Sequence, residues 1–177
     1  MGPMAVQKTV IPVFLLTLAG SLVLLGGIFL GPLFKSQSWD GAAGLLYAVY
    51  SPLCHQLPER SFEFMGFPMT VCGRCLGIYA GFLAGTVLYP FLRGFTRLAL
   101  PPTRFLILLS LPLAIDGLAG LSRLWTTPGP LRFLTGLIWG GLLPYYFIPG
   151  VSSALLERKI RFRVRNGGGL EMNPPKT

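Results

Sequence analysis

The residues best suited to chemistry are three cysteines and one histidine, which are all the cysteines and histidines in the chain. Cys54 and His55 are adjacent, and Cys72 and Cys75 follow in the sequence Cys-Gly-Arg-Cys. Three thiolates and one imidazole form the ligand set of a closed tetrahedral zinc site. The sequence therefore predicts a metal site formed by Cys54, His55, Cys72 and Cys75, with zinc favoured and iron as the second choice.

Other arrangements of the same four residues remain open. The side chains of adjacent residues diverge, so His55 could lie beside the ion or contact a substrate instead of binding the metal. Three cysteine ligands with water in the fourth position would form a catalytic site. Cys72 and Cys75 could instead be a redox pair, or two of the thiols could form a structural disulfide and leave the third free. Inert buried thiols are the remaining alternative.

The composition indicates that lipid surrounds much of the chain. Of the 177 residues 52% are hydrophobic and only 12% are charged, whereas soluble domains carry about a quarter charged residues. About 20 apolar residues suffice to cross a bilayer, and one of the long apolar runs is interrupted only by Asp116. The predicted spans are 9–34, 76–92, 105–122 and 133–156.

The predicted fold is therefore an all-α integral membrane protein with about four transmembrane helices. Residues 41–53 are apolar but too short to span, so we expect an interfacial or re-entrant segment there. A Cys/His loop, residues 54–75, follows it. We expect one membrane domain over 1–156 and a basic, partly disordered cytoplasmic tail over 157–177.

Glycines recur at a spacing of four in two of the predicted spans. Gly77, Gly81 and Gly85 lie on one helical face, and Gly136 and Gly140 repeat the spacing. Small residues four apart let two helix backbones approach closely. Such faces predict tight helix packing, either within the chain or in a homo-oligomer.

The net charge of +9 is explained by the membrane rather than by nucleic acid, because the basic residues flank the apolar runs. Ten basic residues lie on one side of the predicted spans and five on the other. The positive-inside rule then places both termini in the cytoplasm. We expect a multi-pass protein of the cell membrane whose partner is the lipid bilayer, with no nucleic acid bound.

This topology brings charged residues towards the cysteines. An acidic residue within a span is costly and marks a functional or structural pairing; Asp116 is such a residue, and its expected partner is Arg123 or Arg132. A cluster of arginines suits a phosphate or carboxylate group. The residues predicted to contact a substrate or to surround the metal are Arg60, Arg74, Asp116, Arg123 and Arg132.

Three stretches resemble one family of prokaryotic membrane proteins, known as domain of unknown function 2085. They are the run from Cys54 to Phe62, the run from Val71 to Gly81, and the segment from Pro112 to Gly117 with Arg132 beyond it. The resemblance implies a membrane module without an assigned activity. The matching signature residues are Cys54, His55, Pro58, Arg60, Ser61, Phe62, Cys72, Arg74, Cys75, Gly77, Tyr79, Asp116, Gly117 and Arg132. The family tends to carry a polar residue where this chain has Ala119 or Gly120.

Three functions fit these observations. The first is a zinc protein at the outer membrane face, either a metalloenzyme or an assembly factor, acting on a small anionic or lipid-borne substrate. The second is a thiol-disulfide oxidoreductase using Cys72 and Cys75, although a full relay would need a second pair and only Cys54 remains. The third is a small oligomeric transporter or channel. No nucleotide-binding loop and no Ser/His/Asp arrangement is apparent, so the sequence does not decide whether the protein is an enzyme.

Overall fold

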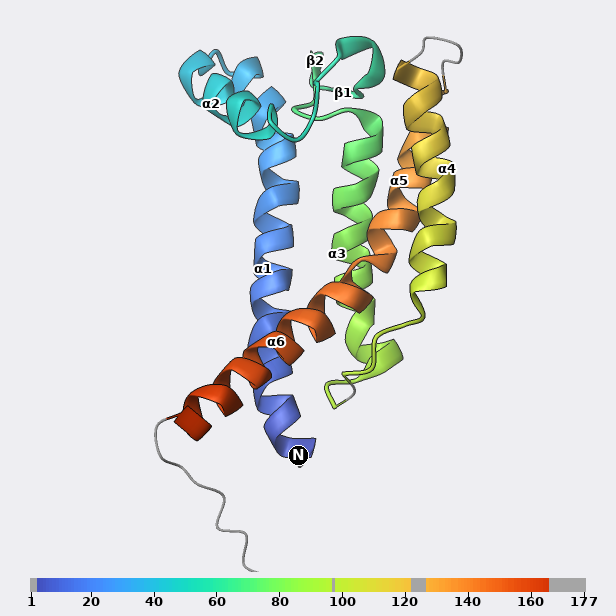
Figure 1. Ribbon diagram of the computed structural model, residues 1–177. Helices are drawn as coiled ribbons and strands as arrows, with labels where there is room; N and C mark the ends of the chain where they lie inside the picture. The colour runs from blue at the N-terminus through green and yellow to red at the C-terminus, as the bar shows by residue number, and fades with distance from the viewer. Residues whose placement is uncertain (1–2, 97, 122–126, 166–177) are drawn as a thin grey trace, which may run out of the picture.

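The computed structural model describes residues 3–96, 98–121 and 127–165, and it is an all-α membrane protein with a small two-stranded hairpin at one end (Figure 1). The elements are α1 (Pro3–Ser36), α2 (Asp40–Tyr50), the 3-10 helix η1 (Pro58–Arg60), β1 (Glu63–Phe64), β2 (Phe67–Pro68), α3 (Gly73–Arg93), α4 (Thr103–Leu121), α5 (Gly129–Leu142) and α6 (Pro144–Arg165). The strands pair antiparallel.

Three helical stretches are long and apolar enough to cross a membrane: Val6–Ser36, Gly73–Arg93 and Gly129–Phe162. The apolar part of α4, Thr103–Ile115, is shorter. Large apolar side chains remain exposed on these helices, for example Phe91 at 82%, as expected where lipid replaces water. The prediction of an all-α membrane protein with about four spanning helices is confirmed.

The last apolar run, 133–156, is divided between two helices. Proline lacks an N–H and its ring clashes with the carbonyl four residues earlier, so Pro144 interrupts the run. Leu143 donates instead to the Gly140 carbonyl at 3.2 Å, and Phe147 donates to the Leu143 carbonyl at 2.9 Å. As a result α6 turns away from α5 and crosses α1 obliquely (Figure 1).

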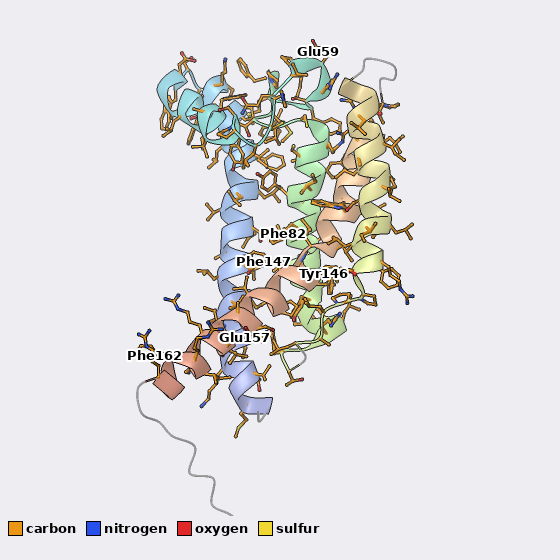
Figure 2. All side chains as sticks on the ribbon, in the orientation of Figure 1. Glu59, Phe82, Tyr146, Phe147, Glu157 and Phe162 are labelled. Atoms are coloured by element: carbon orange, nitrogen blue, oxygen red, sulfur yellow. The ribbon has the colours of Figure 1, made fainter. Side chains whose placement is uncertain are left out.

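An aromatic contact fixes the start of α6 against the bundle. Phe82 of α3 and Phe147 of α6 lie side by side in the middle of the molecule (Figure 2), with ring centroids 6.0 Å apart in an edge-to-face arrangement. From there α6 runs towards the end of the molecule at which α1 begins (Figure 1). The part of the predicted tail beyond residue 165 lies outside the described residues.

Helices α3 and α5 touch through their glycines. A Cβ atom at Gly77, Gly81 or Gly85 would overlap a backbone carbonyl of α5, and one at Gly136 or Gly140 would overlap a carbonyl of α3. Because a backbone carbonyl cannot move aside as a side chain can, only glycine fits at these positions. These faces are used within one chain, so a second copy would have to pack on another surface.

The segments that precede α3 pack against helix α1. Gly27 leaves room for the ring of Tyr50 from α2, and Gly31 leaves room for Thr70. The hydroxyl of Tyr50 donates to the Leu24 carbonyl, and that of Thr70 donates to the Ile28 carbonyl at 3.2 Å. These contacts dock α2 and the loop before α3 onto the last turns of α1.

We expect Gly81→Ala to destabilise the α3–α5 pair, because the added Cβ would also lie 2.8 Å from the Gly141 nitrogen. Overpacking of this kind costs about 1–3 kcal/mol. Thermal denaturation of the detergent-purified protein measures the loss. Gly26→Ala is the matched control, since a Cβ there meets nothing within 4 Å. Equal melting temperatures for the two variants would contradict the proposed role of the glycine faces.

Candidate metal centre

The three cysteine sulfurs come together at one end of the bundle. The Sγ atoms of Cys54, Cys72 and Cys75 all lie within 4.8 Å of one another. None of the three forms a disulfide in the structure; Cys54 is buried and the other two are half-buried. In a tetrahedral zinc site with Zn–S bonds of about 2.3 Å, neighbouring sulfurs are about 3.8 Å apart. The three thiols are therefore spaced closely enough to reach one ion.

The start of α3 determines how two of these cysteines are placed. Cys72 is the N-cap residue of α3, with an extended backbone, and Cys75 lies in the first helical turn. The Cys-x-x-Cys spacing therefore spans the helix start and directs both sulfurs to its N-terminal end. That end carries a partial positive charge, which favours thiolates. The tight fit at Gly73, where a Cβ would lie 3.0 Å from the Phe62 ring, holds the turn in place.

Hydrogen bonds among the sulfurs favour ionisation of Cys72. The neighbouring thiols of Cys54 and then Cys75 lower the pKa of the Cys72 thiol far below its ordinary value, although burial opposes this shift. The backbone N–H of Cys72 also donates to the Cys54 sulfur at 3.1 Å. Thiolates are both the metal-binding and the nucleophilic form of cysteine, so the cluster suits either chemistry.

Gln56 holds the loop that carries Cys54. Its side-chain amide donates to the carbonyl of Tyr47 in α2 at 2.7 Å and to the carbonyl of Thr70, just before α3, at 2.8 Å. Its own backbone has a φ of 51°, which is uncommon for a residue other than glycine. Gln56 thus ties together the two segments that supply the cysteines.

Three arginines and His55 line the cavity beside the cysteines. The cavity has a volume of about 460 Å³ and is bordered by all three cysteines, by Arg60 of η1, by Arg74 of α3 and by Arg132 of α5. His55 is exposed and lines the same cavity, but it does not belong to the group of atoms within 4.8 Å. Of the four predicted ligands, the structure therefore clusters the three cysteines only.

Helix α4 closes one side of this cavity. Gly117 lines it, and a Cβ there would lie 3.8 Å from Nη1 of Arg74. The side chain of the preceding residue, Asp116, lies outside the described part of the structure, and Arg123 lies outside it altogether. The expected pairing of Asp116 with Arg123 or Arg132 therefore stays a prediction.

The residues that position the cluster were not predicted from the sequence. Gln56, Tyr47 and Thr70 act through backbone carbonyls of other segments, and these partners depend on the path of the loops. The spacing of Gly27 and Gly31 could have predicted a close packing contact on α1, because it repeats the four-residue spacing seen in α3.

Comparison with known proteins places this region in a family. The family described as "predicted membrane protein" (DUF2085) matches residues 54–146, which include the three cysteines and the three arginines of the cavity. An uncharacterized protein of Methanocaldococcus jannaschii is 40% identical over 141 residues, covering 77% of this chain and 90% of that protein. One of Methanothermobacter thermautotrophicus is 39% identical over 85 residues, covering 48% of this chain and 75% of that protein. No solved structure matches the chain significantly.

We expect Gln56→Glu to loosen the cluster, because a carboxylate would face two carbonyl oxygens in place of the amide donors. Losing such partly buried hydrogen bonds costs up to about 1–3 kcal/mol. The melting temperature should fall, and Cys54 should be alkylated faster, as followed by peptide mass spectrometry. Gln37→Glu, at an exposed site, is the control. Unchanged alkylation of Cys54 in Gln56→Glu would argue against the positioning role.

Proposed function

Since the chain belongs to the predicted membrane protein family DUF2085, and the matched region carries every cysteine, we propose that the protein is a membrane metalloprotein whose centre is a zinc ion held by Cys54, Cys72 and Cys75. The observation that carries the proposal is the placement of three cysteine sulfurs within 4.8 Å of one another at the start of a helix. Membership of this family does not specify the activity of the metal centre.

The donor set selects the metal. Thiolates are soft ligands that favour zinc and iron, whereas magnesium and calcium prefer oxygen ligands. Zinc fits best, because it takes three or four cysteine or histidine ligands in tetrahedral geometry; iron is second. The positive end of α3 and the N–H of Cys72 stabilise the thiolates that such an ion requires.

The cavity beside the cysteines indicates a working site rather than a closed structural one. Three protein ligands leave a fourth position for water or substrate, and a zinc-bound water ionises near neutral pH. All three cysteines border the cavity, so an ion bound by them would border it too. A substrate entering it would meet the guanidinium groups of Arg60, Arg74 and Arg132, which favour an anionic molecule, either small or lipid-borne.

A thiol-disulfide oxidoreductase is the second candidate. The lowered pKa of Cys72 favours it, because a thiolate attacks a disulfide directly. Cys75 would then resolve the mixed disulfide, with Cys54 beside both. Measuring the metal content together with the number of free thiols distinguishes an oxidoreductase from a zinc protein.

The distribution of basic residues orients the chain in the membrane. Lys8 near the start of α1 and the basic residues in the second half of α6 lie at the same end of the bundle (Figure 1). The positive-inside rule places this end in the cytoplasm. The cysteine cavity then faces the outer side of the cell membrane, within a single membrane domain of residues 1–156 followed by the basic tail.

We predict about one zinc ion per chain in detergent-purified protein, measured by elemental mass spectrometry. Cys72→Ser should lower this to below about one tenth of an ion, because one of three ligands is lost. His55→Ala is the informative companion: it should retain the ion, since His55 lies outside the sulfur cluster. A metal-free wild type with two thiols detectable only after reduction would overturn the metal proposal in favour of disulfide exchange.

We also predict that fluorescent-protein and alkaline phosphatase fusions after Thr177 behave oppositely in bacteria. A cytoplasmic C-terminus gives a fluorescent first fusion and an inactive second one, because the phosphatase folds only after export. An active phosphatase fusion would reverse the proposed orientation while leaving the position of the cavity relative to the helices unchanged.

A further inference from the structure

Arg132 carries a charge at a site where little water can reach it. Its side chain is only 6% exposed, and its Nε finds no hydrogen-bond acceptor among the described residues. A buried N–H without an acceptor is costly, and proteins retain it where a partner or ligand compensates. The position follows from the fold, since Arg132 lies one turn into α5, the helix packed through its glycines against α3.

Arg132 also lies between two cavities. The first is the cavity of the cysteines, and the second, of about 360 Å³, is lined by Glu59, Arg60 and Thr127 among others. Arg60 and Arg132 line both cavities, and Arg74 lines the first. The guanidinium groups of Arg132 and Arg60 are close enough to Arg74 to repel it electrostatically.

The charged side chains that line the first cavity among the described residues are arginines. Three guanidinium groups, those of Arg60, Arg74 and Arg132, line it. No carboxylate lines this cavity among the residues that the structure describes. Glu59 lines the second cavity only, near the end of the molecule formed by η1 (Figure 2). An anion that enters the first cavity would therefore meet three guanidinium groups.

We propose that Arg132, together with Arg60 and Arg74, binds a phosphate group, carried either by a lipid or by free phosphate. This inference rests on the proposed function in that it names the substrate class of the same cavity. A planar guanidinium binds phosphate oxygens through paired hydrogen bonds, and a phosphate has enough oxygens for several arginines at once. Both α3 and α5 begin at this end of the bundle, so their positive ends add to the attraction.

Calorimetric titration of detergent-purified protein tests the proposal with three probes at fixed ionic strength: inorganic phosphate, short-chain phosphatidic acid and short-chain phosphatidylcholine. We expect binding of phosphatidic acid or of inorganic phosphate, and weaker binding of phosphatidylcholine, which lacks a phosphate monoester. Binding of inorganic phosphate identifies the free ion as sufficient. Binding of phosphatidic acid alone identifies the lipid as the source.

Two variants connect the binding to the arginines. Arg132→Lys keeps the charge but loses the planar pair of donors, and Arg60→Gln removes the charge of the half-buried Arg60 side chain. Each should weaken binding roughly tenfold or more. Arg104→Gln, at an exposed position in α4, should bind as the wild type does. Arg60→Gln keeps the test decisive if Arg132→Lys does not fold.

Three results would overturn the inference: no binding of either phosphate probe, measurable binding of both lipids with equal affinity, or unchanged affinity in the folded variants. Metal content, measured on the same preparations, separates this failure from that of the proposed function. A protein that holds zinc but binds no phosphate loses only the substrate class. A protein that binds phosphate through Arg132 but holds no metal keeps the anion site and loses the metal centre.

Discussion

The close approach of α3 and α5 is the constraint on which the rest of the structure depends. Glycines on both helices bring backbone against backbone, so the pair can neither rotate nor separate without losing the whole contact. This arrangement fixes the first turns of the two helices side by side, and Arg74 and Arg132 lie in those turns. Their like charges repel, so backbone packing has to hold together what electrostatics would push apart.

A second set of interactions, hydrogen bonds to backbone carbonyls, stabilises the irregular segment between α2 and α3. Near the hydrocarbon region a backbone carbonyl without a donor is expensive, because no water is available to satisfy it. The side chains of Tyr47, Gln56 and Thr70 supply such donors to carbonyls of neighbouring segments. The same hydrogen bonds bring Cys54 to the start of α3. They therefore both satisfy the backbone carbonyls of the non-helical segment and set the geometry of the cysteine cluster.

The sequence predicted the parts of this fold that follow from local composition. Long apolar runs indicate spanning helices whatever their neighbours, and the confinement of all cysteines to one short segment was enough to predict a cluster. The bend at Pro144 was missed, because the apolar run continues through it without a charge. The different placement of His55 and the role of Gln56 depend on backbone direction in a loop, which residue types alone do not specify.

The oblique course of α6 has a consequence for how the protein rests in a bilayer. Because α6 crosses α1 instead of continuing along α5 (Figure 1), its last two turns, with Arg158, Lys159 and Arg161, are displaced sideways from the bundle. The molecule therefore has a wide, one-sided basic footprint. Where this basic end meets an anionic leaflet, the attraction would act away from the bundle axis and would therefore tilt the helices.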